Sequence, residues 1–111
     1  MQGAMMAKLV EPLADPACAA SDIGQQIARW LTHLRAERRL SPKTLEAYER
    51  DVRQCLMFLG RHWDALVTLE RFAALEPSDI RAFMAARRAE DIGGRSLMRS
   101  LAGLRSFARF L

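Results

Sequence analysis

Residues 95–111, RSLMRSLAGLRSFARFL, constrain the architecture of the chain more strongly than any other segment. The apolar residues of this segment recur at spacings of four, three, four and three: Leu97, Leu101, Leu104, Ala108 and Leu111. At about 100° per residue, these spacings place them on one stripe of a helix. The four arginines of the segment lie off that stripe, and the segment contains no Asp or Glu. We therefore predict a terminal helix that buries its leucines in a bundle and turns its arginines outward.

The basic edge of this predicted helix suits a phosphate backbone. Arg95 and Arg99 are one turn apart, and Ser96 and Gly103 share their arc of the helix. Arginine binds phosphate through a planar fork of donors, and such contacts supply much of a protein's affinity for DNA. We predict that this edge faces double-stranded DNA. The remaining arginines, 105 and 109, lie on the opposite flank, where an internal salt bridge and a second backbone contact are both open.

The composition predicts one all-α domain. A chain of 111 residues has room for a single modest core, and the runs of alternating Val, Ile and Thr that indicate strands are missing. The formal net charge is +4, and fifteen of the 17 basic residues are arginine. Arginine suits nucleic acid better than lysine does. A GC-rich genome also favours Arg and Ala codons together, so the arginine excess alone is weak evidence.

The cysteines and the N-terminus argue against a metal site and a membrane. Cys18 and Cys55 are too few and too far apart for zinc, and Cys55 falls within a helical apolar pattern that predicts a small core residue. Lys8, Glu11 and Asp15 interrupt any apolar run that a signal peptide would need, and no later run reaches transmembrane length. We expect a reduced, cytoplasmic protein with no metal, cofactor, small-molecule ligand or membrane partner.

Capping and turn residues divide the chain into a tail over residues 1–20, expected to be flexible, and a helical domain over 21–111. Ser21 can cap a first helix that ends in Arg35, Arg38 and Arg39. Cations are favoured at a helix C-terminus, so this placement and a role on the DNA backbone are both open.

A second helix is predicted to begin at Ser41-Pro42, an N-cap followed by proline, and to end at Gly60. Its first turn offers free backbone N–H groups, Lys43 and Thr44 to a phosphate, although a plain cap with a solvated lysine also explains them. Residues 61–76 are predicted to form a packed connection with a short helix. A third helix starts at Pro77-Ser78-Asp79, and Gly93-Gly94 separates it from the terminal helix.

No catalytic constellation is apparent. His33 and His62 have no carboxylate or Cys partner at a telling spacing, and Tyr48 has no cluster of Arg and His around it. No glycine-rich phosphate loop follows a strand. The chain is therefore predicted to bind and not to catalyse.

Residues 40–59, LSPKTLEAYERDVRQCLMFL, resemble the second-helix signature of the tyrosine recombinases, also called the phage integrase family. That signature is a Ser, a Thr three residues on, a Tyr four further and an acidic–apolar pair. Residues 77–84 resemble the family's next helix, and residues 95–111 its Arg-x-Leu-Ser-Ala-Leu-Arg-Ser-Phe-Tyr helix. The segments occur in order over residues 22–111, and the Xer type is the most similar group. Ala102, Gly103 and Ala108 stand where that pattern has Ser, Ala and Tyr.

The resemblance implies a compact four- to five-helix bundle, the SAM-like core-binding domain of these enzymes. In the family this domain and a catalytic domain close on DNA as a clamp, and a tyrosine in the catalytic domain cleaves a strand. The catalytic residues lie in that second domain, which we expect this chain to lack. The resemblance also implies a related recombinase subunit as partner in a tetrameric synapse. Carried over by position, the implied DNA contacts are Lys43, Thr44, Ala47, Arg50, Arg95, Ser96, Arg99, Ser100 and Gly103.

Two other interpretations remain open. The chain could be a helical module that binds protein through an apolar groove supplied by Phe107, Phe110 and Leu111, with its arginines only maintaining solubility. It could also be the core-binding domain of a phage or integron integrase, which shares the fold and differs in the target site.

Overall fold

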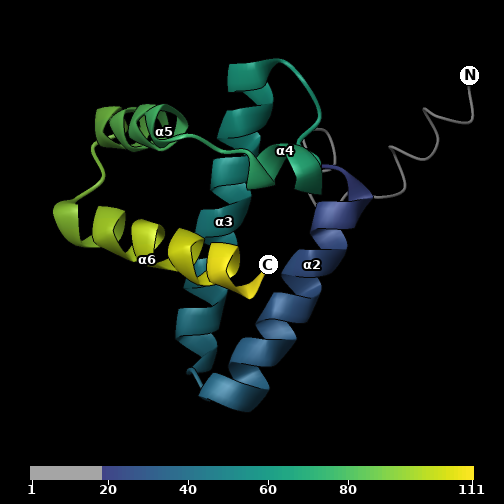
Figure 1. The fold of residues 1–111 in the computed structure, drawn as a ribbon. Helices are drawn as coiled ribbons and strands as arrows, with labels where there is room; N and C mark the ends of the chain where they lie inside the picture. Colours follow the sequence, from purple (N-terminus) through teal and green to yellow (C-terminus); the bar gives the residue numbers. More distant parts are fainter. Residues whose placement is uncertain (1–18) are drawn as a thin grey trace, which may run out of the picture.

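The computed structural model describes residues 19–111, and over this part of the chain the predicted all-α fold is confirmed (Figure 1). In chain order the elements are α2 (Ser21–His33), the π-helical turn η1 (Leu34–Arg38), α3 (Pro42–Trp63), α4 (Leu69–Ala73), α5 (Pro77–Ala89) and α6 (Gly94–Phe110). Of the tail predicted over residues 1–20, only Ala19 and Ala20 are described, and Ala19 pairs with Val67. Cys18 also lies outside the described residues. None of the helices from α2 to α6 is long and apolar enough to cross a membrane.

The long helix α3 is the centre of the bundle. Figure 1 shows α2 and the N-terminal half of α3 as the two arms of a V joined at η1, with α6 crossing α3 near its middle. The short helix α4 lies between the upper ends of the two arms, and α5 lies beside the start of α6. This crossing brings Tyr48 and Asp51 of α3 against Gly103 and Arg99 of α6, although these residues lie far apart in the sequence.

The boundaries of α3 confirm one prediction and correct another. Ser41 is the N-cap: its Oγ accepts the backbone N–H of Thr44 at 3.2 Å, and Pro42 occupies the first helical position. The predicted end at Gly60 is wrong, because α3 continues to Trp63 and ends at Asp64 with a left-handed φ of 54°. A glycine within a helix costs only about 1 kcal/mol relative to alanine. Packing of Trp63 against the core outweighs that cost and extends the helix by a turn.

Trp30 ties three helices together in the core. The ring is fully buried, lies parallel to the Tyr48 ring with centroids 6.3 Å apart, and meets the Phe107 ring at 5.1 Å. Its Nε1–H donates a hydrogen bond of 3.0 Å to the Oγ of Ser106. Cys55 is buried in the same core, as predicted, and burial raises the pKa of its thiol to about 12. The thiol therefore remains protonated and acts as a small apolar side chain.

The buried face of α6 differs from the predicted leucine stripe. Leu97 and Leu104 are buried, but Leu101 is half-buried, and Ala108 and Leu111 are exposed. The residues that complete the buried face are instead Ser100, Gly103 and Phe107. Small residues allow two helix backbones to approach closely, so α6 turns Ser100 and Gly103 toward α3 at the crossing. The leucines then flank the contact instead of forming its centre.

The start of α5 is stabilised by Asp79, whose carboxylate accepts the backbone N–H of Glu76 at 3.0 Å. That hydrogen bond is the largest of the interactions that lower the pKa of Asp79 below its ordinary value of 3.8. The structure also corrects the prediction that His62 has no carboxylate partner, because its Nε2 lies 3.4 Å from Oδ1 of Asp79. Asp79 therefore links the end of α3 to the start of α5.

We expect Asp79→Ala to lower the free energy of unfolding by about 1 kcal/mol at pH 7, the usual effect of losing a helix cap. Because the folded state lowers the pKa of Asp79, its charged form stabilises the fold above pH 3.8, and this contribution is lost as the pH falls through the lower folded value. Urea unfolding followed by circular dichroism measures the loss of stability at pH 7 and its disappearance at low pH. The low-pH measurement is made at about pH 2.5, roughly one unit below the ordinary pKa of an aspartate. An equal difference between variant and wild type at the two pH values would contradict this role.

Candidate nucleic-acid interface

The first turns of α3 present two of the predicted DNA contacts to solvent. Lys43 and Arg50 are exposed, whereas Thr44 and Ala47 are half-buried. Neither Lys43 nor Arg50 forms an ion pair with any described residue. The hydroxyl of Thr44 accepts a hydrogen bond of 3.0 Å from the Oγ of Ser41 and is therefore part of the N-cap. The Thr44 hydroxyl can still donate its own proton to an acceptor such as a phosphate oxygen. The first turns of α3 thus present two cations that are unpaired among the described residues, together with one hydroxyl.

The N-terminal half of α6 carries the second set of predicted contacts. Arg95 is exposed and has no ion-pair partner among the described residues, and Ser96 is half-buried. Arg99, one turn later, is different. Its Nε and Nη2 donate to the two carboxylate oxygens of Asp51 on α3, at 2.8 and 3.1 Å. Of the predicted arginine pair, Arg95 is therefore an exposed cation, whereas Arg99 forms an ion pair that joins α6 to α3.

The ion pair between Arg99 and Asp51 lies at the crossing of α3 and α6. The Asp51 side chain has no exposed surface, whereas the Arg99 side chain keeps 37% of its surface exposed. The hydrogen bond to Asp51 raises the pKa of Arg99, which stays charged. Because two of its three nitrogens are held, the guanidinium has a fixed orientation, and Nη1 is left to donate elsewhere. Asp51 therefore positions Arg99 as well as joining the two helices.

Two of the residues predicted to contact DNA are buried. Ser100 has no exposed surface, and its Oγ has no hydrogen-bond partner in the described part of the chain. Gly103 is packed against Tyr48, whose ring would lie 3.4 Å from an added Cβ. Gly103 therefore packs against α3 instead of facing outward, contrary to its predicted place among the DNA contacts. Both residues are removed from the candidate interface for this reason.

Asp51 was not identified from the sequence as part of the site, although its position on the apolar face of α3 indicated a buried charge. Asp51 stands on the stripe of α3 that also carries Tyr48, Val52 and Cys55, all of which face the core. An ionised carboxylate on a buried face requires a cation beside it. The helical period therefore indicated that some arginine must turn inward, although it could not identify Arg99.

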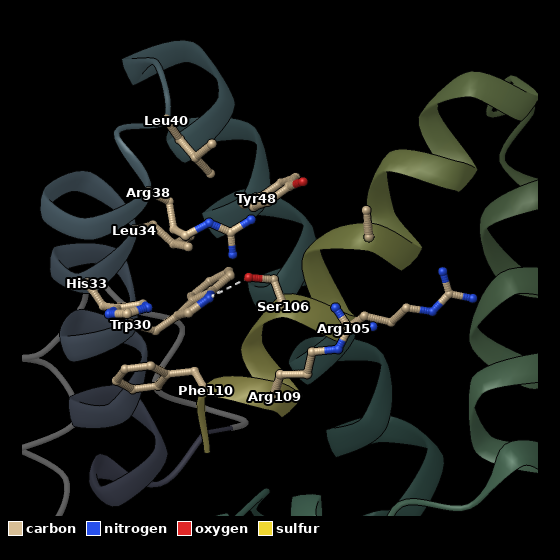
Figure 2. A pocket seen from close by; sticks show the side chains of 11 residues that line it. Trp30, His33, Leu34, Arg38, Leu40, Tyr48, Arg105, Ser106, Arg109 and Phe110 are labelled. Atoms are coloured by element: carbon tan, nitrogen blue, oxygen red, sulfur yellow. Dashed lines mark hydrogen bonds between the residues drawn. The ribbon is translucent and has the colours of Figure 1, made fainter.

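Three further arginines surround a pocket of about 380 Å³ between η1, α3 and α6: Arg38, Arg105 and Arg109 (Figure 2). None of them forms an ion pair with a described residue, which excludes the internal salt bridge considered for the last two within this part of the chain. Tyr48, Leu40 and Ala102 also line the pocket, so it adjoins the start of α3. This cationic pocket extends the basic surface beyond the predicted residues.

The opposite flank of α6 is apolar. Leu101, Leu104, Ala108 and Leu111 line a groove of about 920 Å³ together with residues from α4 and α5, and Arg81 and Arg105 also border it. This apolar groove contains Leu101, Ala108 and Leu111, the part of the predicted leucine stripe that the bundle does not bury fully. Of the three residues suggested for a protein-binding groove, Leu111 lines it, Phe107 is buried in the core and Phe110 lines the cationic pocket instead.

Among the residues described, no group of His, Cys, Asp and Glu could hold a metal ion. The candidate interface on α3 and α6 presents cations, hydroxyls and amides, which can bind an anion.

The family model and the related sequences identify the same protein family. Residues 27–111 match the family model described as phage integrase, N-terminal SAM-like domain. Over 106 residues the chain is 87% identical to the tyrosine recombinase XerC of Nitrobacter winogradskyi and 67% identical to that of Bradyrhizobium diazoefficiens. Each match covers 96% of this chain and 33% of the relative. The XerC of a Methylobacterium species is 58% identical over 92 residues, covering 83% of this chain and 28% of the relative.

The chain thus spans about a third of the length of the curated relatives that it matches. No solved structure matches it significantly. The family model covers the segment from the middle of α2 to the end of α6, which includes every element of the candidate interface. The chain therefore belongs to the phage integrase family and contains its N-terminal SAM-like domain.

Proposed function

We propose that this chain is the DNA-binding domain of a Xer-like tyrosine recombinase, closer to XerC than to XerD. In this proposal it holds one recombination half-site in the cytoplasm while a catalytic domain cleaves a strand through a phosphotyrosine. The partners would be double-stranded DNA and, in a tetrameric synapse, a related recombinase subunit, with chromosome dimer resolution as the outcome. The sequence relationship to XerC proteins supports the class of enzyme.

The observation that carries the DNA-binding proposal is the pairing pattern of the cations. Lys43, Arg50 and Arg95 are exposed and unpaired among the described residues, and they lie on the two helices that cross. Arg99 turns inward at the crossing, where Asp51 neutralises it. The three exposed side chains are therefore cations that no described carboxylate holds in an ion pair, although Glu46 is exposed on the same part of α3. Unpaired, exposed cations are the electrostatic character of a phosphate-binding face.

The role of each residue follows from its exposure. Lys43 and Arg95 are suited to backbone phosphates, and Thr44, Ala47 and Ser96 can approach the duplex as half-buried groups beside them. Arg99, held in one orientation with Nη1 free, is the residue best prepared to donate to a guanine edge or to a phosphate.

A double variant tests the proposal. We expect Lys43→Ala/Arg95→Ala to weaken binding to a fluorescein-labelled duplex by roughly tenfold or more at low salt, because two phosphate contacts are lost. Fluorescence anisotropy measures the affinity. Arg61→Ala/Arg81→Ala is the matched control, since it removes the same charge from the far end of α3 and from the apolar groove. Equal affinities for the two double variants would overturn the assignment of this face.

The apolar groove favours a second candidate function, a protein-binding module. A partner helix could lie between α5 and α6 against Leu101 and Leu111, with Arg81 and Arg105 at the border of the groove. If protein binding were the only function, the wild-type chain would show no affinity for the duplex even at low salt. The anisotropy experiment therefore distinguishes the two functions.

A further inference from the structure

Among the described residues, none of those that line the cationic pocket between η1, α3 and α6 is acidic. Its lining includes Arg38, Arg105 and Arg109, together with His33 and the hydroxyls of Tyr48 and Ser106. Arg38 comes from η1, and the other two arginines come from α6. All three are exposed, and Figure 2 shows the Arg105 guanidinium directed away from Arg38 and Ser106, since Arg105 also lines the apolar groove. By contrast, Arg53, Arg87 and Arg99 each have a carboxylate partner.

Arg38 lies at the end of an irregular turn of the backbone. The chain widens into a π-helical turn at Leu34–Arg38 and then reverses at Arg39, which adopts a left-handed φ of 52°. A non-glycine residue in this conformation carries a cost, so the surrounding structure must maintain it. Figure 2 shows the Arg38 side chain reaching from η1 into the space in front of Tyr48 and Ser106.

The floor of the pocket is rigid and polar. The Oγ of Ser106 accepts the indole N–H of Trp30 at 3.0 Å, and no described residue accepts the proton of Ser106 itself. Trp30 is fully buried and stacked on Tyr48, so it fixes the position of that hydroxyl. The hydroxyl proton of Ser106 and the guanidinium groups of Arg38 and Arg109 are donors at the border of one hollow that contains no carboxylate from the described residues, and such a set of donors binds oxyanions.

We propose that this pocket binds a phosphate group, and that the phosphate belongs to the backbone of the bound DNA strand. The proposal rests on the function proposed above, because the strand must already lie on α3 and α6. Tyr48 is one turn beyond Thr44, and Ala102 is one turn beyond Arg99, so the pocket begins where the candidate interface ends. A backbone that crosses the interface can continue directly into it.

The two tryptophans of the chain provide an internal comparison for the test. The indole N–H of Trp30 lies in the pocket floor, whereas that of Trp63 donates toward Asp79 at the other end of α3, at 3.4 Å. In a ¹H–¹⁵N spectrum of the 111-residue chain, we expect a DNA duplex to shift the Trp30 indole signal and leave the Trp63 signal in place. Inorganic phosphate is titrated separately, because a free anion would report on the pocket without DNA.

The affinity for DNA is measured for the variant Arg38→Ala/Arg109→Ala. We expect this variant to bind the duplex roughly tenfold more weakly at low salt and to reduce the slope of log K against log salt by about 0.9 for each lost contact. The control Arg61→Ala/Arg81→Ala should retain the wild-type slope. Circular dichroism confirms that each variant is folded, and Arg38→Lys/Arg109→Lys should restore part of the affinity because the charge is kept.

The outcomes separate this proposal from the function on which it rests. A Trp30 shift with DNA and a reduced slope would support it. Wild-type affinity in the pocket variant, together with weak binding by Lys43→Ala/Arg95→Ala, would overturn the pocket and leave the DNA interface standing. A Trp30 shift with inorganic phosphate but no binding of DNA would overturn the DNA source and the proposed function, and would identify a site for a free anion. No shift with either probe would overturn the pocket altogether.

Discussion

Arg99→Ala should lower the free energy of unfolding by about 3–5 kcal/mol, the effect expected when a buried ion pair loses one partner. Asp51 has no exposed surface, and the hydrogen bonds from Arg99, at 2.8 and 3.1 Å, are the ones that satisfy its carboxylate. The variant would leave a buried charge without a cation at the crossing of α3 and α6. Domains of this size are stable by roughly 5–15 kcal/mol, so a large part of the stability would be lost.

Arg95→Ala is the matched control for that loss. Arg95 stands one turn before Arg99 on the same helix but is exposed and unpaired among the described residues, so its replacement should change the free energy of unfolding by no more than about 0.5 kcal/mol. Adding Asp51→Ala to Arg99→Ala should recover part of the stability, because the unpaired charge is then removed. Urea unfolding followed by circular dichroism measures all three variants. Similar stabilities for Arg95→Ala and Arg99→Ala would show that the ion pair does not hold the helices together.

Trp30→Ala should destabilise the domain by a comparable amount, about 3–5 kcal/mol. The substitution removes a fully buried indole from between Tyr48 and Phe107 and deletes the hydrogen bond to Ser106. The cavity would open at the point where α2, α3 and α6 meet, and no single helix could move to fill it. We expect this variant to be partly unfolded at 37 °C (a temperature about 10–20 °C below the melting range of ordinary domains).

Trp30→Phe separates packing from hydrogen bonding. It keeps an aromatic ring beside Phe107 and loses the indole N–H, which is worth about 1 kcal/mol, together with part of the packed volume. We therefore expect a loss clearly smaller than that of Trp30→Ala in thermal unfolding followed by circular dichroism. Equal losses would indicate that the bond from Trp30 to Ser106, and not the packing, dominates at this site.

Much of the fold follows from local sequence signals. Ser41-Pro42 marks the start of α3, Pro77 the start of α5 and Gly93 the start of α6, because capping residues and φ-restricted residues act over a single turn. The end of α3 could not be predicted in this way. It depends on Trp63 packing against distant residues, and such contacts outweigh the local preference of Gly60.

The candidate site was predictable only in part, for a physical reason. Periodicity identifies which residues share a helix face, but not how far the helix is rotated about its axis. That rotation is set by the crossing with α3, where Ser100 and Gly103 permit close contact. Lys43 and Arg95 are exposed for any moderate rotation, whereas Arg99, Ser100 and Gly103 lie where a small rotation changes their environment. Arg38 depends on the π-helical turn, for which the sequence carries no simple signature.

The salt dependence of DNA binding by the 111-residue chain tests whether α3 and α6 present their free cations to a sugar–phosphate backbone. Anisotropy titrations of a labelled duplex at several salt concentrations give log K against log salt. With Lys43, Arg50 and Arg95 each neutralising a phosphate, we predict a straight line with a slope of about −3 or steeper. A flat line, or no binding at the lowest salt concentration, would contradict the assignment of this surface to DNA.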